Sequence, residues 1–553
     1  MNADCHFGDL QYIREQAEEK HIAAVFLWDQ IVNFKRKKPA WSEDVVRHCI
    51  ILRHLSTKAY EHVRTEKLLK LPCRSTLQNY IGSSSFETGF NDLIQARLKV
   101  ELEKLEVPQS RVCSLIVDEM RIKPKLQYNK QRDCFVGHVD MGVANEAGAE
   151  PVLANSLLCF IINGLSTAYR IPVACFFTKG LNGKQLSTLT RHVMNKVEEA
   201  GFTILRFVSD NHKVNAPFLL SFDFCHVLKN IRSQFLAREL GKKGEVSSTY
   251  VKKLYDLQKG WIVTPVRSLT RKHVYPNNIE KMNVKTAVEV FSPDVTAALE
   301  FLKDQAGHGS HPSFAFAGPA IAFMKNIFRW FTLHDTSSKV QHIQQRFPDA
   351  RHYDSPEDDR LEWLNVTFPM YIEELKKNAA SPEGFLTKET YEALLLTTYS
   401  TAACVRYLLV TQKFFFVITR KFSSDPIESM FGTLRRSLGC NDQLDVRSGM
   451  SGLEKLLKTG IAAASEESNV LHTEQPEPSK GLLLTATEAC NSSGELPLEA
   501  AHVLKRLKVA RVPASLPTLQ LSATVYVGGY IARYHQGTCD VRQLLFADYE
   551  APV

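Results

Sequence analysis

Hydrophobic and polar residues follow different periods in successive regions of the chain. Between residues 111 and 236, short apolar runs typical of buried strands alternate with an amphipathic stretch typical of a helix. Strands are predicted at Val112–Val117, Cys134–Val139, Ile171–Phe177 and Thr203–Ser209, a helix at Leu186–Ala200, and a further apolar run at Phe218–Phe224. This order of strands and helices predicts a layered α/β domain.

Residues 41–82 have the pattern of three short helices. Ser42 can cap the first and Ser56 or Thr57 the second, because a hydroxyl oxygen accepts a hydrogen bond from an amide in the first turn. Such helices are typical of a helix-turn-helix, although they also occur as packing modules without a nucleic-acid role. In the first interpretation the last helix presents three side chains to DNA, which are Arg74, Gln78 and Asn79.

The C-terminal half of the chain loses the strand pattern. Residues 245–400 are mostly helical, with apolar residues at helical spacing over Met282–Leu302 and Pro319–Thr332. Residues 404–459 are helical again and rich in aromatic residues. From Ala462 to about Ala500 the composition shifts to Ser, Glu, Pro and Ala, which predicts a flexible linker.

Length and composition narrow the class of protein. A chain of 553 residues is too long for one hydrophobic core, so three or four domains are expected. Its twelve cysteines are scattered without a CxxC pair, which favours reduced thiols inside a cell and argues against a zinc module. The sequence shows no signal-peptide core and no apolar run as long as a membrane span, so no membrane partner is expected.

The net charge of +8 is compatible with a nucleic-acid partner. One basic cluster precedes Pro39 and consists of Lys35, Arg36, Lys37 and Lys38. This cluster could contact DNA phosphates or act as a nuclear signal, and the alternative is a solvated linker.

Three acidic residues are the strongest candidates for chemistry. Asp118 and Asp210 each follow a predicted strand, and Glu428 lies in the first turn of a helix that begins at Asp425-Pro426. Carboxylate oxygens are the ligands that Mg²⁺ prefers, and two such ions can clamp the attacking and leaving oxygens of a phosphoryl displacement. The three carboxylates should then lie about 4–8 Å apart. Helix-capping and turn-forming roles are the alternative. Arg435 and Arg436, on the same helix as Glu428, could meet DNA phosphates.

Several motifs, in the same order along the chain, resemble the P-element transposases and their THAP-domain relatives. The resemblance covers roughly residues 20–460. Its motifs are the helix-turn-helix residues between Trp41 and Tyr80, Asp118-Glu119-Met120, Val208-Ser209-Asp210, the segment from His226 to Arg232, and Asp425 with Glu428, Phe431 and Arg435.

The resemblance implies an α/β RNase H-like core that is interrupted by a mostly helical insertion domain and preceded by a small helix-turn-helix domain. The corresponding regions are a helical and basic N-terminal segment at 1–38, the helix-turn-helix at 39–95, the N-terminal portion of the core at 108–244, the insertion at 245–403, the C-terminal portion of the core with Glu428 at 404–460, a linker at 461–500 and a C-terminal segment at 501–553. The insertion resembles the family's GTP-binding domain, although no motif locates nucleotide contacts.

The resemblance also implies a reaction. Asp118, Asp210 and Glu428 would hold Mg²⁺ or Mn²⁺ while water attacks a phosphodiester at an element end, and the freed 3′-OH would then attack target DNA. The implied partners are DNA at the element ends and at the target, and a second copy of the chain. The implied location is the nucleus, and no zinc is expected.

The sequence departs from the family near its start. The family begins with a zinc-binding THAP domain, whereas Cys5 is the only cysteine before Cys49 and no ligand pattern follows. Either the sequence is truncated or this copy has lost that DNA-reading module. Three hypotheses remain: a DNA transposase, a transposase-derived DNA-binding or scaffold protein without catalysis, and a structure-selective nuclease on the same fold.

Overall fold

A computed structural model provides the fold. It describes residues 3–19, 21–81, 87–129, 133–145, 151–209, 219–259, 264–379, 381–437 and 444–467. Three sequence predictions lie wholly or largely outside these residues: Asp210, the linker expected at 461–500 beyond residue 467, and the segment expected at 501–553.

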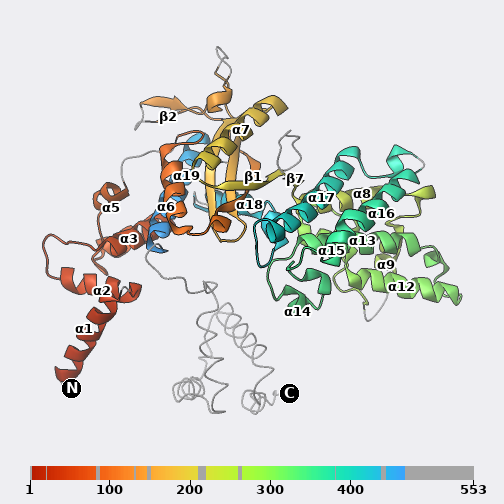
Figure 1. Ribbon diagram of the computed structural model, residues 1–553, viewed down its shortest axis with the longest axis horizontal. Helices are drawn as coiled ribbons and strands as arrows, with labels where there is room; N and C mark the ends of the chain where they lie inside the picture. Colours follow the sequence, from red (N-terminus) through yellow and green to blue (C-terminus); the bar gives the residue numbers. More distant parts are fainter. Residues whose placement is uncertain are drawn as a thin grey trace, which may run out of the picture. The chain divides into compact units, whose positions relative to one another are not determined.

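A five-stranded mixed sheet forms the centre of the α/β region (Figure 1). Its strand order is β5 (Arg170–Thr178), β4 (Ser156–Gly164), β1 (Val112–Arg121), β6 (Thr203–Ser209) and β7 (Leu219–Phe222). Strand β4 is antiparallel to both of its neighbours, β5 and β1, while β6 and β7 run parallel to β1. This arrangement confirms the expected α/β core.

Burial explains why β1 and β4 lie in the middle. The first six residues of β1 are buried, and the strand emerges from the core only at Asp118, which is half-buried, and at Glu119, which is exposed. Every residue of β4 is buried. The sequence prediction missed β4, because its continuous apolar run shows no alternation that separates a strand from a buried helix.

The strand predicted at Cys134–Val139 is shorter than expected. Strand β3 covers only Cys134–Val136 and pairs with β2 (Gln127–Asn129) in a separate two-stranded ribbon. Beyond Val136 the chain continues as isolated bridges at His138 and Asp140, because Gly137 turns it away from the ribbon with a φ of +137°.

Helices from both ends of the chain complete the core around the sheet. Helices α6 (Asp92–Lys104), α7 (Gly183–Glu199) and α19 (Val446–Glu467) pack against β5, and α18 (Asp425–Ser437) packs against β1 and β4. Phe431 and Leu434 of α18 are buried in the same core as β1, as their spacing predicted. Two expected domain boundaries fall within helices, since residue 95 lies inside α6 and α19 continues past residue 461, and the division of the chain into domains stays a prediction.

A small helical unit precedes the sheet. It contains α3 (Glu43–Leu55), α4 (Thr57–Thr65) and α5 (Arg74–Ile81), and it follows α1 (Ala3–Glu18) and α2 (Ile22–Asn33). Ser42 and Ser56 cap α3 and α4 through their hydroxyls, as predicted. The buried Tyr60 donates its hydroxyl proton to the carbonyl of Pro72 at 2.8 Å, which fixes the turn before α5.

The region between β7 and α18 consists, in its described residues, of helices joined by loops, with two isolated β-bridges. Its helices are α8 (Phe224–Ala237), α9 (Thr249–Gln258), α10 (Arg271–Val274), α11 (Val284–Phe291), α12 (Pro293–Gly307), α13 (Gly318–His334), α14 (Gln341–Gln345), α15 (Asp359–Glu362), α16 (Phe368–Lys377) and α17 (Lys388–Val410). All of these helices except α14 contribute residues to one apolar core.

The apolar residues at helical spacing over Met282–Leu302 lie in two helices, because Ser292 is extended and Pro293 begins α12. Residue 403, the expected domain boundary, lies inside the continuous helix α17. Helix α17 is long and apolar enough to cross a membrane by composition, but it packs against β7 and α8 as a core helix.

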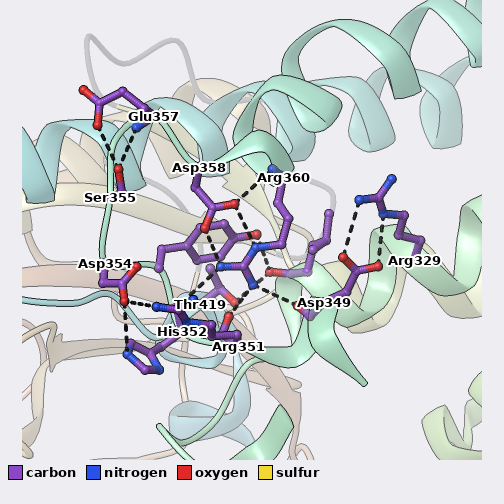
Figure 2. A network of polar contacts seen from close by, with 12 residues as sticks. Arg329, Asp349, Arg351, His352, Asp354, Ser355, Glu357, Asp358, Arg360 and Thr419 are labelled. Atoms are coloured by element: carbon purple, nitrogen blue, oxygen red, sulfur yellow. Dashed lines mark hydrogen bonds and ion pairs between the residues drawn. The ribbon is translucent and has the colours of Figure 1, made fainter. Parts of the chain in front are cut away.

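A network around Arg360 fixes the segment between α14 and α16 (Figure 2). The guanidinium donates to both carboxylate oxygens of Asp358, at 2.9 and 2.6 Å, and to the carbonyls of Asp349 and His352, each at 3.1 Å. Arg329 binds the carboxylate of Asp349 at 3.1 Å. The network satisfies a buried cation, which otherwise would carry a large desolvation cost.

Candidate active site

Asp118 lies where the central strand leaves the core. Its carboxylate accepts a hydrogen bond from the amide of Glu119 at 2.7 Å. In the sheet Asp118 pairs with Cys159 of β4, and the preceding residue Val117 pairs with Ser209, the last residue of β6. Asp118 is therefore held by rigid strands on both sides of β1.

Glu428 lies in the first turn of α18, the helix that packs on β1 and β4. The amides of Ile427 and Glu428 donate to the carbonyl of Ser424, which marks the helix start. The Glu428 carboxylate contacts His226 Nε2 at 3.3 Å and accepts from the Ser424 hydroxyl at 3.3 Å. The hydrogen bond from His226 lowers the pKa of Glu428, so the carboxyl is ionised at neutral pH.

Asp223 connects the two residues that contact Glu428, which are His226 and Ser424. It is 1% exposed, and its carboxylate accepts from the amide of His226 at 3.0 Å, which caps α8. Its other oxygen accepts from the amide of Ser424 at 3.0 Å. One buried carboxylate thus ties the start of α8 to the start of α18, although the two residues are 201 positions apart. The sequence prediction missed this role.

A second clamp joins α18 to the insertion. Arg420 donates to the carboxylate of Asp425 at 2.7 Å and also to that of Asp335, which follows α13. Burial alone would lower the pKa of Arg420, but the two carboxylates raise it above its usual value, so the guanidinium stays charged. Asp425 was expected as the helix cap, yet its side chain binds Arg420 instead, and Ser424 stands at the cap position.

The structure packs the helix that carries Glu428 against the strand that carries Asp118, and the convergence of the carboxylates stays a prediction. Within the residues that the structure describes, no three His, Cys, Asp or Glu side chains gather at metal-binding distance. The third predicted ligand, Asp210, lies outside those residues. The donor set itself consists of carboxylate oxygens and suits a hard divalent cation. Glu119 is not part of the set, because it faces away and accepts from the Thr178 hydroxyl at 3.0 Å.

The predicted DNA-contacting cations lie on the surface. Arg74 is exposed at the start of α5, while the side chains of Gln78 and Asn79 lie outside the described detail. Arg435 and Arg436 are exposed in the last turn of α18. The cluster Lys35, Arg36, Lys37 and Lys38 is exposed between α2 and α3.

Comparison with protein families identifies two matching regions. Residues 86–222 match the TNP-like, RNase H N-terminal domain, and residues 225–346 match the TNP-like, GTP-binding insertion domain. The first region contains the sheet up to β7, and the second begins in α8. The boundary between the two matched domains therefore coincides with Asp223, which caps the start of that helix.

Two curated proteins show similarity over long stretches. The human DNA transposase THAP9 is 25% identical over 306 residues, which are 50% of this chain and 33% of the relative. The transposable element P transposase of Drosophila melanogaster is 18% identical over 449 residues, which are 76% of this chain and 54% of the relative. The chain thus spans between a third and about half of these relatives.

A solved structure shares the fold. The Drosophila P element transposase strand transfer complex superposes with a TM-score of 0.64 at 17% identity, covering 80% of this chain and 98% of that chain. The likeness confirms an RNase H-like core with a helical insertion.

Proposed function

We propose that this chain is a transposase of the P-element type, which cleaves DNA and joins the cut end to a second DNA. One observation supports the proposal above the others. The strand that carries Asp118 pairs with β6, whose last residue Ser209 directly precedes Asp210, and the helix that carries Glu428 packs on that same strand. Asp118, Asp210 and Glu428 would serve as the three ligands.

The proposed reaction is one kind of displacement carried out twice. In the first step a water oxygen forms a bond to phosphorus, and the 3′ oxygen of the terminal nucleotide of the element leaves and takes up a proton. In the second step the freed 3′-OH attacks a phosphodiester of target DNA, loses its proton and displaces another 3′ oxygen. Divalent ions held by the carboxylates would supply charge stabilisation for the attacking and leaving oxygens.

The residues of the chain contribute position. Asp118 is fixed by the central strand, and His226 with Ser424 holds the Glu428 carboxylate in one orientation. Preorganised ligands lower the cost of assembling a charged transition state, because little reorganisation remains to be done during the reaction. Asp223 fixes both holders through its two amide contacts.

Further proposals follow from the family. The helices α3 to α5 would bind DNA as a helix-turn-helix, and the exposed cations Arg74, Arg435 and Arg436 would meet phosphates. The region matched as a GTP-binding insertion domain would bind GTP. Two copies of the chain would act together on two DNA ends in the nucleus, with Mg²⁺ or Mn²⁺ as the metal.

An in vitro cleavage and strand-transfer assay tests the function. Asp118→Asn removes a ligand charge without changing shape, and we expect at least about a thousandfold loss of cleavage. Glu119→Gln is the matched control, because this neighbour is exposed on the other side of the strand and should keep wild-type activity.

Three outcomes separate the hypotheses. Wild-type activity no greater than that of Asp118→Asn would contradict the enzyme and favour a DNA-binding scaffold. Cleavage without joined products would indicate a nuclease. Cleavage followed by joining, lost together in Asp118→Asn, supports the transposase.

A further inference from the structure

The ribbon formed by β2 and β3 leaves the sheet directly after the strand of Asp118. The chain passes from Arg121, the last residue of β1, to Gln127, the first residue of β2. The amide of Ile122 donates to the carbonyl of Asn155 at 2.8 Å, and that of Lys123 donates to the carbonyl of Leu444 at 2.6 Å. These bonds fix the outgoing arm to β4 and to the start of α19. Figure 1 shows β2 apart from the five-stranded sheet.

The returning arm is fixed as firmly. Gly137 comes so close to the outgoing arm that an added Cβ would lie 2.2 Å from the carbonyl oxygen of Lys125. Its own carbonyl accepts from the amide of Ala154 at 2.9 Å. The ribbon is therefore a braced element with a defined direction.

Two aromatic rings are exposed on this ribbon. Tyr128 and Phe135 are direct cross-strand partners, with ring centroids 5.5 Å apart. Tyr128 is 43% exposed and Phe135 64% exposed, although they touch each other. The Tyr128 hydroxyl donates to the carboxylate of Asp133, which holds its ring in place. Leaving large rings in water is unfavourable, so this pair is poised for a flat ligand.

Positive charge accompanies the rings. Arg121, Lys123 and Lys125 are exposed along the outgoing arm. Aromatic side chains interleaved with lysine and arginine are the combination that binds single-stranded nucleic acid, because bases stack on the rings while the cations contact phosphates.

We propose that the ribbon of β2 and β3 binds unpaired bases of DNA next to the phosphate to be cut, by stacking them on Phe135 and Tyr128. The inference rests on the proposed function, since it makes DNA the ligand and Asp118 the neighbouring reactive site. The bases can belong to any sequence, because every base offers a stacking face. Lys123 and Lys125 contact the phosphates on either side.

The test measures binding by the full chain in EDTA, where metal-dependent cleavage does not occur. The probes are a blunt duplex and the same duplex with three unpaired bases at one 3′ end, one of them 2-aminopurine. For Phe135→Leu we expect about tenfold weaker binding of the unpaired probe, less than twofold change for the blunt probe, and loss of 2-aminopurine quenching. Phe135→Trp should restore both binding and quenching.

Two control variants separate stacking from other effects. Phe316→Leu changes an aromatic ring that is 82% exposed in the insertion, and it should leave both probes unaffected. Lys125→Gln should weaken binding of the unpaired probe and reduce its salt dependence by about one ion, because Lys125 contacts a phosphate beside the unpaired bases. Thermal unfolding of each variant verifies that it is folded.

The failure of this inference differs from failure of the proposed function. Equal affinity of wild type and Phe135→Leu for the unpaired probe overturns the inference, while the cleavage assay with Asp118→Asn still stands. A Phe135→Leu protein that binds DNA normally but loses self-association in sedimentation assigns the rings to a second copy of the chain, which also overturns it. A wild-type chain that binds neither probe overturns both proposals.

Discussion

At the residue scale, Asp223 connects two helices that are distant in the sequence. A single buried carboxylate caps α8 and holds the amide that begins α18. Hydrogen bonds to a charged acceptor are stronger than neutral ones, and losing the acceptor leaves a buried amide unsatisfied. The orientation of Glu428 therefore depends on a residue that is itself too buried to touch substrate.

Replacing Asp223 by alanine tests this dependence. We expect Asp223→Ala to lower the free energy of unfolding by about 2–3 kcal/mol, since it removes a helix cap and a second buried acceptor. Urea unfolding measures the loss. Asp256→Ala is the control, because Asp256 is exposed and its one ion pair among the described residues is with Lys259, so its loss should cost less than about 0.5 kcal/mol. Equal shifts in the two variants would contradict the bridging role.

Local patterns predicted the candidate acids but not their partners. Asp118 was found because an apolar run ends in a carboxylate, and Glu428 because Asp425-Pro426 is a common helix start. The contact between His226 and Glu428 joins residues 202 positions apart, and such a pairing leaves no periodic trace in either segment. Asp210 stays a prediction, and so does the 4–8 Å spacing of the three carboxylates.

At the element scale, backbone conformation decides where the pattern holds. Hydrophobic periodicity predicted α7 and α18 well because their apolar residues repeat along one side. The apolar residues over Met282–Leu302 form two helices instead of one, since the helical spacing continues across Pro293 but the helical backbone is interrupted there. The ribbon depends in the same way on one glycine at the crossing of its arms.

Two glycine substitutions should act in opposite directions. Gly137→Ala places a Cβ against the Lys125 carbonyl in a left-handed conformation, and we expect it to destabilise the chain by about 2 kcal/mol or more. Gly432→Ala lies in mid-α18 with no atom within 4 Å of the added Cβ, and it should stabilise by about 0.5–1 kcal/mol. The melting temperatures of the two variants, compared with wild type, provide the measurement.

At the scale of the whole molecule, buried charge joins the sheet to the insertion. Arg206 of β6 is fully buried and donates to Thr401 of α17 at 3.1 Å, and its guanidinium lies over the ring of Phe422 at 4.4 Å. His334 of α13 lies in the same region, and one of its ring nitrogens bonds the Trp330 carbonyl at 2.7 Å. Burial lowers the pKa of His334 from 6.5 to about 4, and the charge of Arg206 adds to that effect.

This buried histidine makes stability depend on pH. Between pH 6.5 and 4 the unfolded chain binds a proton at His334 that the folded chain rejects, so stability falls as the pH drops through this window. About 2 kcal/mol should be lost between pH 7 and 5. Urea unfolding of wild type and His334→Gln at both pH values isolates this contribution, because the other groups titrate alike in the two proteins. A variant with the same pH dependence as wild type would sink the assignment.

The assembly of one core from distant regions of the chain has a consequence for biosynthesis. Strand β1 is made about 300 residues before α18, and neither can bury its apolar surface without the other. The helical insertion has its own apolar core and can fold on the emerging chain before the sheet is complete. A ribosome that stops before α18 would therefore release a folded insertion attached to an unfinished sheet with exposed strands. Premature stop codons as late as residue 420 should consequently yield aggregating or degraded products rather than shortened, partly working enzymes.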